Sequence, residues 1–495
     1  MSNDLKVQLK AVATAAADGT VAFPRFKQEQ LVKLYNVLSN QRATLEEALL
    51  ADVGLTKSEA EIELVETLSL VKRLVEESDF KLQTEKAEKQ LREKGKFYRG
   101  KGVVVVRAEN AAPIWSTIAP LATAISTGNA VVCLLPESTP TVSSALQTAL
   151  AASLNRFAYV FTSAVSLSEI LKSGNLPSTS TLVVSGPSPQ TLEYPLLLNQ
   201  AGSSGPTILI DRLLPSSPPH LLAHYARLIA RASFHAQGRL PGSVHRVIVH
   251  QESVEQVLAA LQAEIRSTFG DDAEKPSNGW ARSGSVRKEK QDLKHLLSSV
   301  NEMGQGKILI GGAVKREVDS LSPTVITEPS LELLRKDVRG PVLLVQTFAS
   351  HEDAFYLLDQ IDSSVLHVFS GETAALEYIA TESTAVTVYG NNIPMSALYD
   401  PHGALIKASS YVTDCNFHLT TLSNRLPTSQ LARLSLAALP KSLAYNRTKF
   451  SNSILRVFFL QGVFLSLGTV ATALLAGLGF GGWLAVGWIK GRYFV

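Results

Sequence analysis

Hydrophobic and polar positions follow two different patterns along the chain. Between residues 5 and 75 the leucines recur mostly at steps of three and four, with polar or charged side chains between them: Leu31, Leu34, Leu38, Leu45, Leu49 and Leu50. This spacing puts the apolar side chains on one face of a helix, so the region is predicted to be helical. Residues 81–96 are rich in Lys, Glu and Gln and suit an exposed connection.

Short apolar runs begin after this charged stretch and predict buried strands. Val103–Val106 is a β-branched run between Gly102 and Arg107, typical of a strand covered on both faces. A helical segment at 120–127 and a second strand at 130–135 follow it. Strand signals recur at 181–184, 208–210 and 246–249, and a helical pattern follows at 254–265. The alternation predicts an α/β fold with mostly parallel sheets.

The C-terminal region carries a different signal. No charge occurs from Val457 to Ile489, and a bilayer core needs about 20 apolar residues per helix. Arg456 precedes the stretch and Lys490 follows it, so we expect a transmembrane segment, either one tilted helix or a hairpin broken at 477–482. The N-terminus has no apolar core of a signal peptide, so the body of the chain is expected to face the cytosol from a C-terminal membrane anchor.

Charge and cysteine content exclude several classes of protein. The 495 residues include 47 Lys and Arg against 44 Asp and Glu, a formal charge of +3, with no long basic run, so no nucleic-acid partner is expected. Cys133 and Cys415 are the only cysteines, which argues against a disulfide framework. His235, His245 and His250 show no recognised ligand spacing, so no metal site is predicted.

Four segments of the chain resemble segments of the aldehyde dehydrogenase superfamily and follow one another in the same order. The likeness is greatest to the membrane-anchored fatty-aldehyde branch. The best is PLATAISTGNAVV at 120–132, and the others are FGDD at 269–272, LSPTV at 321–325 and DVRGPV at 337–342. The likeness extends over about residues 6–392. It implies an α/β, aldehyde-dehydrogenase-like architecture with two doubly wound domains, a C-terminal arm and a transmembrane segment.

The resemblance also implies domain limits. A Rossmann-like cofactor-type domain is expected at 1–205, a catalytic-type domain at 206–395, an oligomerisation arm and linker at 396–456, and the transmembrane segment at 457–489. Members of the family dimerise through such an arm, so the resemblance implies a homodimer. The family's glycine-rich run is replaced here by DPHGA at 400–404, which puts the usual dimer geometry in doubt.

In the family, a cysteine thiolate attacks the aldehyde, an Asn side chain and a backbone N–H hold the oxyanion, hydride passes to a nicotinamide, and a Glu activates water. The matching nucleophile segment, HAQGRL at 235–240, places Leu240 at the cysteine position. The base motif should precede 208–211, but residues 200–205 hold no carboxylate. Glu193 is the alternative as a displaced base, and Asn110 matches the oxyanion asparagine with an offset of one residue.

The resemblance implies an altered cofactor site. Leu135 stands where the family has a ribose-binding Lys, and Glu137 keeps a carboxylate one position early. Gly186 and Ser188 match the pyrophosphate turn, in which two prolines now remove N–H donors. Asp337 matches the Glu that binds the nicotinamide ribose. Residual affinity for NAD or NADP is left open.

Two functional hypotheses follow. The favoured one is a membrane-anchored aldehyde-dehydrogenase-like protein without thiol-based oxidation, acting as a scaffold, a carrier of an aldehyde or acyl ligand, or a regulatory partner. The alternative is NAD(P)-dependent oxidation of a long-chain or pathway-specific aldehyde through a displaced cysteine, Glu193 and Asn110. Leu240 favours the first, because loss of a nucleophile typically costs several orders of magnitude in rate.

Overall fold

A computed structural model describes most of the chain up to residue 416. The described residues are 3–79, 83–85, 89, 96–163, 165–177, 181–185, 197–199, 205–213, 219–269, 293, 295–298, 300, 302, 304–311, 314–315, 320–336, 338–403 and 405–416. The chain divides into two compact units, 1–79 with 99–413 and 80–98 with 414–495. The predicted transmembrane segment and residues 417–456 of the predicted arm lie outside the described residues. Within the described part, no helix combines the length and apolar character needed to cross a membrane.

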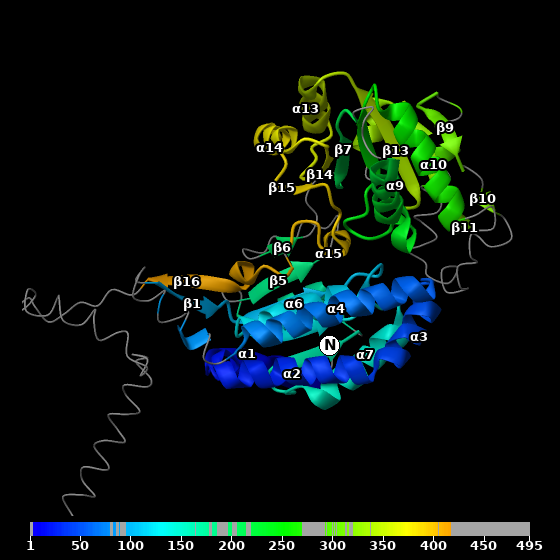
Figure 1. The fold of residues 1–495 in the computed structure, drawn as a ribbon. Helices are drawn as coiled ribbons and strands as arrows, with labels where there is room; N and C mark the ends of the chain where they lie inside the picture. The colour runs from blue at the N-terminus through cyan, green and yellow to red at the C-terminus, as the bar shows by residue number, and fades with distance from the viewer. Residues whose placement is uncertain are drawn as a thin grey trace, which may run out of the picture. The chain divides into compact units, whose positions relative to one another are not determined.

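The helices alternate with strands over most of the larger unit (Figure 1). The α-helices are α1 (Asn3–Ala17), α2 (Pro24–Asn40), α3 (Arg42–Asp52), α4 (Lys57–Glu77), α6 (Pro113–Ser126), α7 (Pro140–Ser153), α8 (Leu167–Lys172), α9 (Pro219–Phe234), α10 (Val254–Phe269), α12 (Leu331–Arg335), α13 (His351–Gln360), α14 (Thr373–Glu382) and α15 (Met395–Tyr399). Short 3₁₀ turns are η1 (Thr20–Ala22), η3 (His235–Gly238) and η5 (Ala408–Tyr411).

The strands form two large and two small sheets. Their bounds are β1 (Lys96–Gly100), β2 (Val103–Arg107), β3 (Ala130–Leu134), β4 (Tyr159–Thr162), β5 (Thr181–Ser185), β6 (Leu197–Asn199), β7 (Thr207–Ile210), β8 (Arg246–His250), β9 (Lys307–Ile310), β10 (Val314–Lys315), β11 (Ser320–Leu321), β12 (Thr324–Thr327), β13 (Val342–Phe348), β14 (Val365–Phe369), β15 (Thr387–Gly390) and β16 (Val412–Asn416). The small sheets pair β1 with β16 and β10 with β11.

Both large sheets are wound in two directions from a central strand. The five-stranded sheet has the order β4-β3-β2-β5-β6 and is parallel throughout. The seven-stranded sheet has the order β15-β14-β7-β8-β13-β12-β9, in which β9 alone of the described strands runs antiparallel to its neighbour. The prediction of an α/β fold with parallel sheets is therefore confirmed, whereas the domain boundaries stay predictions. The winding reverses beside β2, so the loop after β2 lies where open α/β sheets commonly bind ligands.

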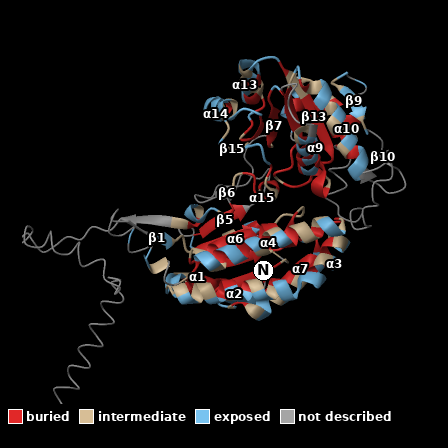
Figure 2. Cartoon of the chain, viewed as in Figure 1, coloured by how far each residue is buried: buried red, intermediate tan, exposed pale blue. Residues whose placement is uncertain are grey.

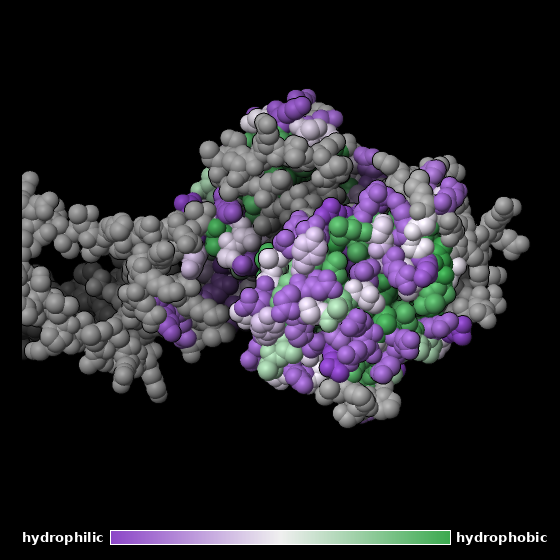
Figure 3. Space-filling view, turned by 90° about the horizontal axis from the view of Figure 1, so that it is seen from above, coloured by the Kyte–Doolittle hydropathy of each residue, from purple (hydrophilic) through white to green (hydrophobic). Residues whose placement is uncertain are grey.

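The hydrophobic runs identified in the sequence form the centre of the first sheet. All four residues of Val103–Val106 are fully buried, and β3 is buried along its whole length. Figure 2 shows the same burial along α6, which contacts both strands. On the face drawn in Figure 3, hydrophilic residues surround smaller hydrophobic areas. Single exposed apolar side chains such as Tyr356 and Val386 are ordinary for a protein surface.

The helix after β2 begins earlier than the sequence pattern indicates. The helical segment predicted at 120–127 is the second part of α6, which begins at Pro113 and contains Pro120 in its interior. Pro113 occupies the first turn, where a missing N–H has no helical partner to lose. Every residue from Pro113 to Ile125 is buried, and this packing keeps the helix continuous through the second proline.

Candidate functional site

The loop that aligns with the family's nucleophile segment has an unusual backbone. It follows α9, and three consecutive residues are left-handed: Ala236 (φ 48°), Gln237 (φ 57°) and Gly238 (φ 63°). Such conformations are costly for residues with a Cβ, so surrounding contacts must hold them. Leu240 comes two residues later, is only 4% exposed and packs into the main hydrophobic core. A buried hydrocarbon side chain therefore occupies the position aligned with the thiol.

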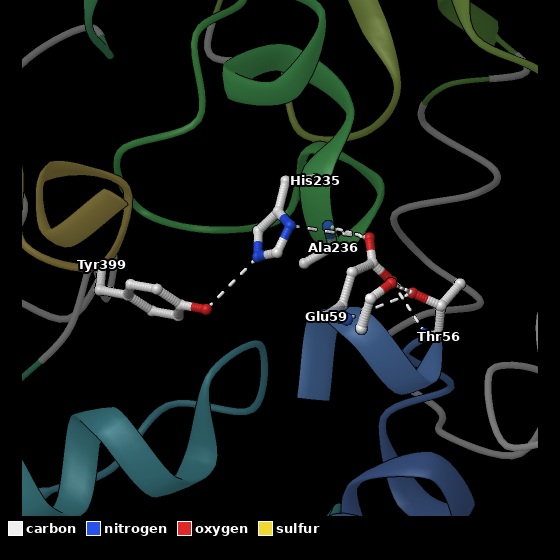
Figure 4. A network of polar contacts seen from close by, with 6 residues as sticks. Thr56, Glu59, His235, Ala236 and Tyr399 are labelled. Atoms are coloured by element: carbon white, nitrogen blue, oxygen red, sulfur yellow. Dashed lines mark hydrogen bonds and ion pairs between the residues drawn. The ribbon is translucent and has the colours of Figure 1, made fainter. Parts of the chain in front are cut away.

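One carboxylate from α4 holds the first part of this loop. The backbone N–H of Ala236 donates to Oε1 of Glu59 at 2.7 Å. The other oxygen, Oε2, accepts the backbone N–H of Thr56 at 2.8 Å and its hydroxyl at 2.9 Å (Figure 4). The backbone bond, together with the Glu59 N–H donated to the Thr56 hydroxyl oxygen, forms the capping box at the start of α4. Glu59 thus joins a helix start to the loop, since each of its oxygens serves one of them.

His235 continues this chain of contacts to α15. Its Nδ1 lies 3.9 Å from Oε1 of Glu59, and its Nε2 lies 3.3 Å from the hydroxyl of Tyr399 (Figure 4). Burial lowers the pKa of His235, Glu59 acts to raise it, and Arg231 acts to lower it. Burial raises the pKa of the Tyr399 phenol, as do three carboxylates of α4: Glu63, Glu66 and Glu59.

The order carboxylate, imidazole, hydroxyl is that of a hydrolytic triad, but the chemistry differs. A nucleophilic hydroxyl needs a lowered pKa or an effective base. Burial and nearby carboxylates instead favour the protonated phenol of Tyr399. We therefore assign Glu59, His235 and Tyr399 a positioning role for the loop.

Backbone contacts hold the remainder of the loop. The N–H of Gly340 donates to the carbonyl of Gly238 at 3.1 Å, and the N–H of Gly242 donates to the carbonyl of Leu398 at 2.8 Å. A Cβ at Gly238 would lie 2.3 Å from the carbonyl oxygen of Gly340, and a Cβ at Gly242 would lie 2.0 Å from that of Ala397. Glycine is required at both positions because the loop backbone lies directly against another backbone segment and leaves no space for a side chain.

A second carboxylate of α4 binds the start of α6. Glu63 is 1% exposed, and its Oε1 accepts the backbone N–H groups of Ile114 at 2.9 Å and Trp115 at 3.0 Å. Burial raises the pKa of Glu63 to about 7, although these two hydrogen bonds act to lower it. The ring of Trp115 in turn lies 5.3 Å from the ring of Tyr399. α4, α6 and α15 therefore meet around the loop.

Asn110, the expected oxyanion residue, is half-buried in the loop after β2. Its neighbour Glu109 is chemically more unusual. Burial raises the pKa of Glu109 to about 7, against the opposing effect of Arg339 and then Arg107. Oε1 of Glu109 is buried without a hydrogen-bond partner among the described residues. Such a carboxyl has the properties of a proton donor or acceptor. The sequence motif indicates Asn110 only, although a carboxylate just after the central strand is also visible in the sequence.

The described part of the expected cofactor site lacks the family's cation. Leu135 is buried in the core, and Glu137 is exposed. A buried isobutyl group supplies neither charge nor donor to a ribose, so position 135 does not fit the family's mode of binding NAD. Four other predicted site residues lie outside the described residues: Gly186, Ser188, Glu193 and Asp337.

The cysteines do not replace the missing nucleophile in the described part of the chain. Cys133 is a fully buried free thiol in β3, and burial raises its pKa well above the usual range. A thiol that resists deprotonation is a poor nucleophile. The backbone of Cys415 lies in β16, and its side chain is outside the described residues. No cluster of three or more His, Cys, Asp or Glu side chains suited to a metal occurs in the regions that the structure covers.

Sequence comparisons agree on one family. A family model described as "Aldehyde dehydrogenase family" matches residues 222–412. Aldehyde dehydrogenase family 3 comG of Dictyostelium discoideum is 28% identical over 131 residues, which are 26% of this chain and 26% of that protein. Aldehyde dehydrogenase family 3 member B1 of Mus musculus is 23% identical over 413 residues, 78% of this chain and 82% of the relative. The chain is therefore similar to aldehyde dehydrogenases, with the family model matching its residues 222–412.

Solved structures of aldehyde dehydrogenases share the fold of this chain. The substrate-bound AldH of Staphylococcus aureus has a TM-score of 0.66 and 17% identity, over 87% of this chain and 99% of that one. A Thermus 1-pyrroline-5-carboxylate dehydrogenase with bound NAD has a TM-score of 0.64 and 16% identity, over 82% and 84%. The sequence match covers only 26% of the Dictyostelium protein and 39% of a probable betaine aldehyde dehydrogenase of Schizosaccharomyces pombe. The activities of these two relatives are therefore not assigned to this chain.

Proposed function

We propose that this chain is an aldehyde-dehydrogenase-fold protein that does not oxidise aldehydes through a thiol, and that it acts as a scaffold, ligand carrier or regulatory partner at a membrane. The observation that carries the proposal is Leu240. Its side chain is buried in the core at the position aligned with the nucleophile, and the loop around it is held by Glu59 and Tyr399. Cys133, in β3, is fully buried and resists ionisation.

The altered cofactor positions support the same proposal. The relatives include a dehydrogenase solved with NAD, yet Leu135 here supplies no charge to a nucleotide. In the alternative hypothesis the chain would oxidise a long-chain aldehyde with NAD or NADP, using Glu193 as the base and Asn110 for the oxyanion. A carbonyl compound could still bind non-covalently near Asn110, since an amide is a hydrogen-bond donor. We therefore propose an aldehyde or acyl compound as the carried ligand.

Turnover tests the proposal. The purified full-length protein is mixed with NAD or NADP and a series of medium and long aldehydes, and reduced nucleotide is followed by absorbance. We expect no aldehyde-dependent signal. We also expect none from Leu240→Cys, because residues 200–205 still lack the carboxylate of the base motif. Aldehyde-dependent reduction of the nucleotide by the unmodified chain would reject the proposal in favour of the alternative.

Membrane attachment is a separate part of the proposal and rests on the uncharged stretch 457–489. We propose that this segment anchors the protein with its body in the cytosol, and that the arm at 396–456 forms a homodimer. After expression in cells, the full chain should remain in the membrane pellet during alkaline carbonate extraction and dissolve in detergent. Light scattering of the detergent-solubilised protein should give the mass of two chains. Release by carbonate would reject the anchor, and a monomeric mass would reject the dimer.

A further inference from the structure

The short helix α15 packs directly on the loop that carries position 240. Its Leu398 carbonyl accepts the N–H of Gly242 at 2.8 Å, and the Ala397 carbonyl occupies the space that a side chain at residue 242 would need. Leu398 is fully buried. The contact is therefore formed by the two backbones and leaves no room for a side chain at residue 242.

Tyr399 at the end of α15 fills the space beside this contact. It is 2% exposed, and its ring lies 5.3 Å from that of Trp115 in α6 and edge-on to His235 at 6.3 Å. Its hydroxyl lies 3.3 Å from Nε2 of His235 (Figure 4). A large aromatic side chain therefore bridges α6 and the loop five residues before Leu240.

The loop depends on this bridge because its own backbone is unfavourable. Ala236 and Gln237 are left-handed although neither is glycine. Residues with a side chain are strained in this region and persist there where neighbouring contacts determine them. Glu59 supplies such a contact on one side of His235, and Tyr399 supplies the other. Removal of the Tyr399 ring leaves a void beside His235, into which the loop can relax.

We propose that Tyr399 closes position 240 off from solvent and from any carbonyl ligand, by bridging Trp115 and His235 and holding the loop in its buried arrangement. In this arrangement the Tyr399 ring blocks access to position 240. This inference concerns access to the position and holds whether or not the chain turns over aldehydes. The result of its test is therefore independent of whether the proposed function is correct.

Thiol labelling measures this access directly. Leu240→Cys is placed in the full chain with Cys415→Ser, so that the buried Cys133 is the only other thiol. The folded protein is treated with a chromogenic aromatic disulfide, and the labelling rate is recorded. We expect labelling at position 240 to be slow, and Tyr399→Ala to raise the rate by about tenfold or more, because thiol reactivity in a core follows local opening.

Two further variants make the test specific. Tyr399→Phe keeps the ring and loses the hydroxyl, so it should raise the labelling rate less than Tyr399→Ala. Tyr159→Ala removes another buried tyrosine, in β4, whose ring stacks on Phe26, and should leave the rate unchanged. If Tyr399→Ala does not fold, Tyr399→Leu replaces it, with the same expected rise. Fast labelling with Tyr399 intact, no rise on truncation, or an equal rise with Tyr159→Ala would overturn the proposal.

Discussion

The Oε1 atom of Glu59 lies 2.7 Å from the backbone nitrogen of Ala236, a residue 177 positions further along the chain. Glu59 belongs to the capping box of α4, and Ala236 is the first left-handed residue of the loop before Leu240. A single side chain therefore links the start of a helix to the loop that would hold the nucleophile in a relative. The stability of the loop and that of α4 are coupled through this carboxylate.

This coupling predicts a large effect of Glu59→Ala. The change removes the capping box and leaves the Ala236 N–H without its acceptor, so the free energy of unfolding should fall by about 2 kcal/mol. Denaturant titration of the full-length protein in detergent measures it. Glu76→Ala, at the exposed end of α4, is the control and should change stability by less than about 0.5 kcal/mol. Equal effects of the two variants would contradict the role given to Glu59.

Glu63 predicts a dependence of stability on pH. Its pKa is raised from 4.5 to about 7 in the folded protein. A raised pKa means that the folded state binds the proton more tightly, so this stabilising contribution is complete below about pH 4.5 and is lost as the pH rises through about 7. Glu63→Gln removes the titration and keeps an acceptor for the N–H groups of Ile114 and Trp115.

At pH 8, Glu63→Gln should therefore be more stable than the unmodified protein by up to about 3 kcal/mol, since one pKa unit corresponds to about 1.4 kcal/mol. At pH 4.5 the two should be nearly equal. Urea midpoints at both pH values check this, with Glu76→Gln as the control. A gain that is the same at both pH values would show that ionisation of Glu63 is not its cause.

The lack of space around Gly242 predicts that a larger residue there lowers the stability of the protein. A Cβ there would lie 2.0 Å from the Ala397 carbonyl oxygen, so α15 must move away from the loop in Gly242→Ala. Overpacking of this kind typically costs about 1–3 kcal/mol. Gly371→Ala is a matched control, because a Cβ at Gly371 meets nothing within 4 Å. Thermal midpoints should fall for the first variant only, and an unchanged midpoint for Gly242→Ala would show that the two backbones are not so close.

At the start of β8, the stability of the fold is expected to depend on the planar guanidinium of Arg246 and not on its positive charge alone. Its buried guanidinium donates to three backbone carbonyls: Leu334 at 2.6 Å, Gly205 at 3.0 Å and Lys336 at 3.1 Å. An ammonium cannot reproduce this planar fork, so Arg246→Lys should lower the free energy of unfolding by about 3 kcal/mol. Arg212→Lys, in an exposed pair with Glu252, should change it by less than about 0.5 kcal/mol. A similar small loss in both would contradict the prediction.

The sequence predicted the parts of the fold that depend on local patterning. The strands at 103–106, 130–135 and 246–249 correspond to β2, β3 and β8, because short and largely apolar runs fit sheets covered on both faces. The pattern at 120–127 indicated only the second part of α6, because local rules do not include the burial that carries a helix through an interior proline.

Less of the candidate site could be predicted from the sequence. Leu240 could be aligned by motif order, but its contacts could not. Glu59 precedes the loop residue His235 in the sequence and Tyr399 follows it by 164 positions, and no spacing rule connects the three. Glu109 is a different case, because a carboxylate at the end of the central strand is visible in the sequence, while its burial and raised pKa depend on the folded surroundings.

The most direct test of the central claim is the intact mass of the full-length protein after incubation with NAD and a long-chain aldehyde, measured under acidic conditions that preserve thioesters. Thiol-based oxidation must pass through an acyl group bound to a cysteine. We predict a mass identical to that of the untreated chain. An acyl adduct on Cys133 or Cys415 would contradict the proposal that this protein lacks the covalent chemistry of the aldehyde dehydrogenases that it resembles.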